Sequence, residues 1–227
     1  MPAPITIVFA LYPGVTQLDF TGPHQVLARL PGANLIVASA AGGLIEADGL
    51  AFAGLARLKD IERCDVICVP GGLGCTAAMN DAAFMDQISR LADGATYVTS
   101  VCTGSLILGA AGLLKGKRAA CHWAWRDMLP LFGAIADPAR VVRDGNVITG
   151  GGVTAGIDFA LALAAEIAGP DVAQSIQLML EYAPAPPFNA GRPETAPPEV
   201  LARVQALMAP MAAARRAEAE RAARGAA

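Results

Sequence analysis

Residues 95–114 read ATYVTSVCTGSLILGAAGLL, and the fold follows from this stretch. Ala95–Ser100 is rich in apolar and β-branched residues, which predicts a buried strand, and Leu106–Leu114 predicts a helix. Between them stands Val101-Cys102-Thr103-Gly104-Ser105, whose small residues permit a sharp turn. A buried strand that leads directly into a helix is typical of βαβ units, so we expect an α/β fold with a mostly parallel sheet.

The same alternation of strand and helix extends outward in both directions. Further strands are predicted at Ile5–Leu11, Leu35–Ser39 and Asp65–Val69. Further helices are predicted after Asp19 or Thr21, which could each cap one, and at Ala82–Leu91, His122–Phe132, Thr154–Ala168 and Asp171–Leu180. Asp48-Gly49 and Asp144-Gly145 each signal a hairpin turn between short apolar runs.

The chain length of 227 residues suits one well-filled domain. We expect a single α/β domain over residues 1–198, which ends in an irregular loop over Ala183–Pro198. The remaining residues, 199–227, form an Ala-rich helix that packs on the domain or extends from it. A solvated helix with a frayed end is the simpler interpretation of its mixed Arg and Glu residues.

Charge and cysteine content restrict the class of protein. The chain carries 17 basic and 20 acidic residues without a basic stripe, so nucleic acid is not an expected partner. No secretion signal and no membrane span are predicted, and the odd number of cysteines, 5, favours reduced thiols in the cytoplasm. With only 2 histidines in the chain, a metal site is not expected.

Cys102 is the first candidate for chemistry. A cysteine at a turn between a strand and a helix is projected from the end of the sheet, as in a nucleophile elbow. The unpaired amides at a helix N-terminus favour a thiolate and would lower the pKa of this thiol. The alternative, a small buried hydrophobe, fits the pattern equally well.

Three further segments could serve the same site. Asp19 lies in the apolar loop after the first strand, where burial would raise its pKa and suit it to proton transfer. The alternative is an N-cap for the helix near Gly22, and the two roles can coexist. In the Pro70-Gly71-Gly72 turn, the glycine amides could stabilise developing negative charge. His122 could be the base of a Cys-His pair or a histidine satisfied in the core.

Several segments together resemble the PfpI/glutaminase-like (DJ-one) superfamily, and within it the branch that hydrates isocyanides. The resemblance covers nearly the whole chain except the last helix, and it rests on LDFTGPHQVLA, VICVPGGLG, YVTSVCTGSLILGAAGLLKGKRA, HWAW, VVRDGNVITGGGVTAGIDFALALAAE and QLMLEYAPAPPFNAG. It implies a flavodoxin-like, class I glutaminase-like three-layer sandwich and a homodimer. It also implies a cofactor-independent hydro-lyase that converts an isocyanide into an N-substituted formamide.

The resemblance also assigns roles to individual residues. Cys102 is the implied nucleophile, Asp19 the general acid/base, and Thr103 the residue that follows the nucleophile in the active site. The residues implied to line the substrate pocket are Gly71, Gly72, Leu73, His122 and Val153. The other four cysteines, Cys64, Cys68, Cys75 and Cys121, are expected to be structural.

The sequence argues against one other activity of the superfamily and leaves a ligand- or redox-sensing role open. Thr103 stands where the protease-like and deglycase-like branches typically have His, and no His follows His122, so amidotransferase chemistry is not expected. Regulators of the same superfamily use the domain to sense ligands, but their DNA-binding module has no counterpart here. Cys102 could also serve a non-enzymatic ligand- or redox-sensing protein.

Overall fold

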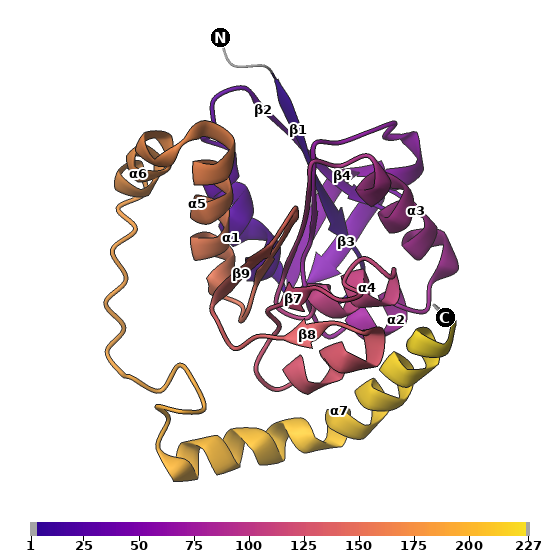
Figure 1. The fold of residues 1–227 in the computed structure, drawn as a ribbon, viewed down its shortest axis with the longest axis vertical. Coiled ribbons are helices and arrows are strands. Elements are labelled where there is room, and N and C mark those ends of the chain that lie inside the picture. Colours follow the sequence, from indigo (N-terminus) through magenta and orange to yellow (C-terminus); the bar gives the residue numbers. More distant parts are fainter. Residues whose placement is uncertain (1–3, 226–227) are drawn as a thin grey trace.

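The computed structural model describes residues 4–225 and contains one mixed sheet of 8 strands, in the order β3-β4-β2-β1-β5-β6-β10-β9 (Figure 1). The strands are β1 (Ile5–Leu11), β2 (Ala33–Ser39), β3 (Gly43–Ala47), β4 (Leu50–Arg57), β5 (Val66–Val69), β6 (Tyr97–Val101), β9 (Val141–Asp144) and β10 (Val147–Gly150). A separate two-stranded ladder joins β7 (Arg118–Ala119) to β8 (Ile135–Ala136). All neighbours in the main sheet are parallel except the two outer hairpins, which confirms the predicted α/β fold.

Helices cover both faces of the sheet, and the result is the expected three-layer sandwich (Figure 1). On one face, α1 (Gln17–Leu27) packs against α5 (Ala155–Ala168), and α5 packs against α6 (Pro170–Met179). On the other face, α3 (Ala82–Asp93) and α4 (Gly104–Ala110) lie over β5 and β6. The remaining helices are η1 (Leu58–Asp60), α2 (Cys75–Ala78), η2 (Arg126–Phe132) and α7 (Pro198–Gly225).

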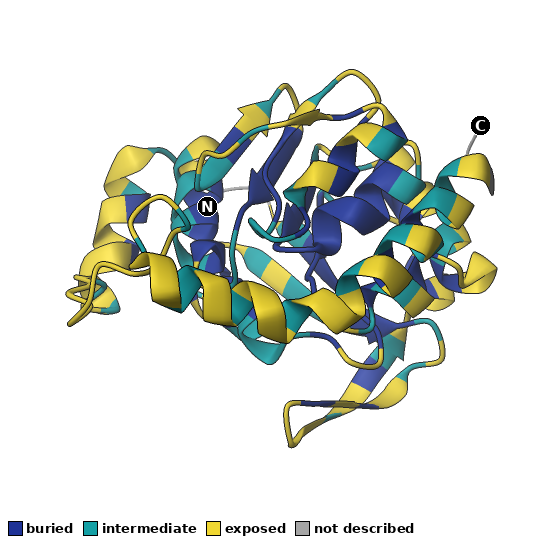
Figure 2. Ribbon diagram, turned by 90° about the horizontal axis from the view of Figure 1, so that it is seen from below, coloured by how far each residue is buried: buried dark blue, intermediate teal, exposed yellow. Residues whose placement is uncertain are grey.

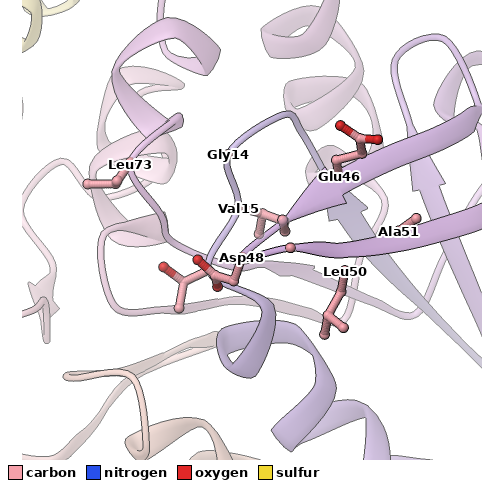
Figure 3. A pocket seen from close by; sticks show the side chains of 10 residues that line it. Gly14, Val15, Glu46, Asp48, Leu50, Ala51 and Leu73 are labelled. Atoms are coloured by element: carbon pink, nitrogen blue, oxygen red, sulfur yellow. The ribbon is translucent and has the colours of Figure 1, made fainter.

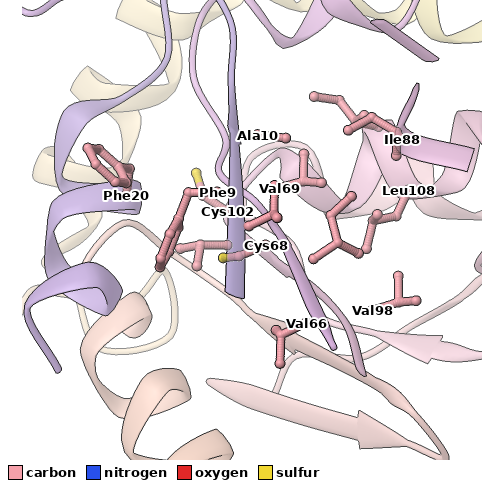
Figure 4. Close-up of a cluster of buried hydrophobic side chains, with 14 of the residues drawn as sticks. Phe9, Ala10, Phe20, Val66, Cys68, Val69, Ile88, Val98, Cys102 and Leu108 are labelled. Carbon is pink, nitrogen blue, oxygen red and sulfur yellow. The ribbon is translucent and has the colours of Figure 1, made fainter. Parts of the chain in front are cut away.

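The core forms where the central strands are apolar on both faces. Every residue of β5 is buried, and so are the last five of β1, because helices cover both sides of these strands. Figure 4 shows part of this core, in which the rings of Phe9 and Phe20 pack edge to face with their centroids 5.4 Å apart. The aliphatic composition thus builds a rigid sheet, and its carboxyl edge carries the segments singled out above.

Both predicted hairpins are present. Asp48 and Gly49 adopt positive φ values of 53° and 79° between β3 and β4, and Gly145 adopts 62° between β9 and β10. Left-handed backbone at these turns suits Gly and Asp, which explains why the two Asp-Gly signals were informative. Both hairpins lie at the outer edges of the sheet, so the parallel centre is undisturbed.

Helix boundaries differ from the prediction in several places, including α4, which spans Gly104–Ala110 rather than Leu106–Leu114. α1 begins at Gln17, and its first amide donates to Asp48 Oδ2 over 3.1 Å, so neither Asp19 nor Thr21 caps it. The segment from His122 is a turn, and the 3₁₀ helix η2 starts only at Arg126. α6 begins at Pro170 after Gly169, and Asp171 is not its cap. The start of α1 is thus capped by Asp48, and that of α6 is set by Pro170, rather than by the nearest Asp in the sequence.

The C-terminal segment has two contrasting parts. Residues 183–190 are all exposed, and no residue of α7 before Met211 is buried (Figure 2). Further along α7, however, Arg215 and Ala219 are buried against the domain. The expectation of a solvated, frayed helix is therefore wrong for its second half. None of the helices in residues 4–225 is long and apolar enough to cross a membrane.

Candidate active site

Cys102 occupies the expected elbow at the end of β6. Its φ is +58°, a strained left-handed conformation for a residue with a side chain, and its amide donates to Gly150 O over 2.9 Å. The Ser105 hydroxyl donates to Cys102 O over 3.0 Å. A Cβ on Gly104 would lie 2.0 Å from Val69 O, so only glycine lets α4 begin so close to β5. The turn is thus fixed on both sides of the thiol.

Asp19 meets this elbow from the first turn of α1. Its side chain is 0% exposed, and its Oδ2 accepts a hydrogen bond from Gly71 N over 3.0 Å. Its Oδ1 is buried and has no hydrogen-bond partner among the described residues. A buried carboxyl oxygen without a partner is costly, and such atoms often mark functional sites. The geometry therefore favours a chemical role over the N-cap alternative.

The two side chains form a coupled acid pair. Burial raises the pKa of Asp19 to about 7, against the lowering effects of the Cys102 thiol and the Gly71 amide. Burial, and next the negative charge of Asp19, raise the pKa of Cys102, although the Thr103 amide lowers it. The expectation that the helix N-terminus lowers this thiol pKa is therefore wrong, because desolvation outweighs the amide. Near neutral pH the pair retains at least one proton.

The Thr103 hydroxyl and the backbone of the Gly71–Gly72 loop support the Cys102–Asp19 pair. Gly72 N donates to Thr103 Oγ1 over 2.9 Å, and Thr103 Oγ1 donates to Gly72 O over 3.3 Å. A Cβ on Gly71 would lie 2.5 Å from Thr103 N and 2.8 Å from Asp19 Oδ2. Both loop amides are occupied by protein acceptors, so they are not the free donors that the sequence suggested. Their function in this structure is to hold Asp19 and Thr103.

Leu73 lies apart from these residues, on a pocket of about 420 Å³ beside the β3–β4 hairpin. Figure 3 shows Leu73 across this pocket from Glu46 and Leu50. Val153 and His122 line a different pocket, of about 680 Å³, with Gly152. The structure thus brings Cys102, Asp19, Thr103, Gly71 and Gly72 together and places the other three predicted residues in two flanking pockets.

His122 does not pair with the nucleophile. Its Nδ1 accepts a hydrogen bond from Ala124 N over 3.3 Å, and no hydrogen bond joins it to Cys102 within residues 4–225. Burial, assisted by the positive charge of Arg215, lowers the pKa of His122. Without a hydrogen bond to the thiol in the described part of the chain, His122 is not positioned as a base for Cys102.

The other cysteines lie in the interior as free thiols. Burial raises the pKa of Cys64 to about 11, and those of Cys68 and Cys121 to about 12, while Cys75 is also buried. Inert, buried thiols of this kind behave as small hydrophobes. No group of three or more potential metal ligands is found in the part of the chain that the structure describes.

The fold and the elbow define a class of α/β protein with a cysteine site at the carboxyl edge of the sheet, and residues 5–166 match the DJ-1/PfpI family. The chain belongs to that family.

One curated relative and two solved structures indicate where this chain stands. The chain is 52% identical over 220 residues, 96% of both chains, to an isonitrile hydratase from Pseudomonas putida. It superposes with a TM-score of 0.92 and 43% identity on a ThiJ/PfpI family protein from Pseudomonas syringae, covering 97% of this chain and 91% of that one. For DJ-1beta of Drosophila melanogaster the TM-score is 0.71 at 26% identity, over 80% and 100% of the two chains.

Sequence reasoning did not identify three residues that surround the site. Tyr12 is buried and donates from its hydroxyl to Pro70 O over 2.8 Å, which ties the first loop to the glycine loop. Trp125 and Arg215 are buried together beside Gly72. A Tyr directly after a buried strand was a usable signal for the first. Nothing local in the sequence distinguished Arg215 from the other arginines of its helix.

Proposed function

We propose that this protein is an isonitrile (isocyanide) hydratase, a hydro-lyase that converts R–N≡C and water into the formamide R–NH–CHO. The observation that carries the proposal is the buried Asp19 carboxyl, with an unpartnered oxygen, held against a cysteine on a strained elbow. The 52% identity to the Pseudomonas putida isonitrile hydratase over 96% of each chain supports the same chemistry.

The first half of the reaction uses the proton that the pair retains. The sulfur of Cys102 attacks the terminal isonitrile carbon, and the shared proton passes from Asp19 to the same carbon. The product is a thioimidate, R–N=CH–S–Cys102, and Asp19 is left as a carboxylate. The raised pKa of about 7 suits this step, because an acid of ordinary pKa would have lost its proton at neutral pH.

The second half consumes water. The Asp19 carboxylate removes a proton from water as the oxygen bonds to the thioimidate carbon, and it then delivers that proton to the nitrogen. The C–S bond breaks with departure of the thiolate, the C=O bond forms, and the hydroxyl proton returns to the Cys102–Asp19 pair. Atoms and charge balance with one thiol, one carboxyl and water, so the proposal includes no cofactor and no metal.

Binding of the R group is assigned to residues around the elbow. Gly71 and Gly72 form its floor, since no Cβ could fit at Gly71. Val153 and His122 share a pocket with Cys121, whose thiol interacts electrostatically with Cys102. Leu73 lines the separate pocket beside the β3–β4 hairpin.

The proposal further describes a cytoplasmic homodimer. Five free, buried thiols support a reducing compartment. Exposed apolar side chains on α6, the following loop and α7 support burial against a second copy of the chain, and they are Leu178, Met179, Phe188 and Leu207. Sedimentation equilibrium of the purified protein would give twice the mass of the chain; a single-chain mass at micromolar concentration would refute the dimer.

The test of the activity is hydration of a simple alkyl isocyanide by the purified protein, followed by NMR of the formamide, with Cys102→Ala measured in parallel. We expect formamide carrying one ¹⁸O when the reaction is run in ¹⁸O-water, and none above the uncatalysed rate from the variant. A wild-type protein without turnover, yet with Cys102 oxidised by peroxide, would replace the hydratase with the sensing alternative.

A further inference from the structure

The second half of α7 is attached to the domain at several separate points. Ala219 is fully buried, Asn80 donates to Glu218 Oε2 over 3.1 Å, and Arg216 pairs with Asp127. These contacts reach from the end of α2 to η2. The helix is therefore fixed in position at this end, in contrast to its exposed first half.

Arg215 stands at the centre of these contacts and is only 4% exposed. Its guanidinium carbon lies 4.5 Å from the centre of the Trp125 ring, and its Nη2 is 3.4 Å from both Gly72 O and Leu73 O. No carboxylate pairs with it within residues 4–225. An aromatic face and two carbonyl dipoles therefore compensate a buried positive charge.

The carbonyl that Arg215 contacts belongs to the loop that holds the acid pair. Gly72 O also accepts from Thr103 Oγ1, Gly72 N donates to Thr103 Oγ1, and the preceding amide, Gly71 N, donates to Asp19 Oδ2. A single short loop thus connects a guanidinium on the last helix to the carboxyl on the first. The DJ-1/PfpI match ends at residue 166, so Arg215 lies outside it.

From this arrangement we propose that Arg215 is a positioning residue, which fixes the Gly71–Leu73 loop so that its amides hold Asp19 and Thr103 against Cys102. The inference rests on the proposed function for its catalytic consequence. It also gives a purpose to Trp125 of the HWAW segment, which the reaction itself does not use: the centre of its ring lies 4.5 Å from the Arg215 guanidinium carbon, and the ring face stabilises the charge.

The consequence can be read at Asp19. The Gly71 amide lowers the pKa of this carboxyl, so a loop released from Arg215 would raise the pKa above its present value of about 7. Several charged or titratable groups act on Asp19 or respond to its charge. They lie on four strands or just after them: Tyr12 after β1, Asp48 after β3, Cys68 on β5 and Cys102 after β6. None of them contacts Arg215 by a hydrogen bond in the described residues.

The experiment is a ¹³C NMR titration of protein labelled at the aspartate carboxyl carbons, with the Asp19 signal assigned by its loss in Asp19→Asn. Wild type is compared with Arg215→Met and with the matched control Arg216→Met, which removes the neighbouring exposed arginine. We expect the midpoint of Asp19 to rise by about half a pH unit or more in Arg215→Met and to stay at the wild-type value in the control.

Turnover supplies a second measurement. In Arg215→Met we expect kcat for isonitrile hydration to fall roughly 10-fold with KM changed less than about 2-fold, because misplaced catalytic groups lower the rate more than binding. A folded Arg215→Met protein with the wild-type Asp19 midpoint would overturn the proposal. If that variant does not fold, Arg215→Gln takes its place with the same criterion. The titration needs no substrate, so it decides the role of Arg215 even if isonitriles are not turned over.

Discussion

Cys102 and Cys68 are both buried, and both feel the negative charge of Asp19, yet only one occupies a site (Figure 4). Cys68 lies within β5, paired with Phe9 and Thr99 on the neighbouring strands. Cys102 lies just beyond β6, where the backbone turns at φ +58° and the side chain interacts with the buried Asp19 carboxyl. The comparison shows that position at the carboxyl edge of the sheet, rather than burial or thiol chemistry, makes a cysteine a candidate nucleophile.

The strongest test of this comparison replaces each thiol in turn. Cys102→Ala should lower isonitrile hydration by at least about 10³-fold, because the thioimidate forms on this thiol. Cys68→Ala should keep the rate within roughly 2-fold and cost on the order of 1–2 kcal/mol of unfolding free energy, as expected for a small cavity in the core. Formamide production and urea unfolding measure the two effects. Equal loss of rate in both variants would contradict the comparison.

Asp19, whose charge raises the pKa of both thiols, gives the next largest effect. Asp19→Asn should lower kcat by roughly 10²–10⁴-fold, since the amide neither donates nor accepts the proton of the reaction. A variant with wild-type turnover would remove Asp19 from the mechanism.

The same substitution should change how stability depends on pH. The folded pKa of Asp19, about 7, exceeds the ordinary value of 3.8, so its stabilising contribution is complete below about pH 3.8 and is lost as the pH rises through 7. Asp19→Asn escapes this loss. The free energy of unfolding of Asp19→Asn minus that of wild type should therefore be larger at pH 8 than at pH 5. The increase should be on the order of a few kcal/mol. Urea unfolding at the two pH values measures it, and parallel curves would refute the raised pKa.

The loop beside the elbow should be less tolerant than a glycine elsewhere. Gly71→Ala forces a Cβ to within 2.5 Å of Thr103 N, so we expect a loss of about 1–3 kcal/mol in unfolding free energy and a reduced kcat. Gly94→Ala is the matched control, since a Cβ there meets nothing within 4 Å. Thermal unfolding of both variants measures the difference; equal stability would show that the loop can move away.

The smallest effect is expected at the pocket wall. His122→Gln should change kcat less than about 5-fold, because the imidazole makes no hydrogen bond to Cys102 in the described structure and keeps its contact with Ala124. Any change should fall mainly on KM, which initial rates over a range of isonitrile concentrations would reveal. A loss as large as that of Cys102→Ala would restore the Cys-His mechanism.

Much of the site could be predicted because its signals are local. The strand, cysteine and glycine of residues 97–104 each constrain the backbone within a few positions, and the structure places the turn there. The pKa of Cys102 could not be predicted in this way. Its direction depends on how completely Asp19 and the surrounding helices exclude water, and that property belongs to the assembled sheet edge.

Local signals in the sequence were enough to predict the α/β class and the two hairpin turns and to mark Cys102 and Asp19 as separate candidates, and the family resemblance paired them. Periodicity, turn chemistry and residue type act over short distances along the chain. Only the tertiary structure decided that the amides of Gly71 and Gly72 bind protein acceptors, that His122 stands apart, and that Arg215 reaches the glycine loop from the last helix. Those contacts join residues up to 143 positions apart, and their existence depends on how the helices pack on the sheet.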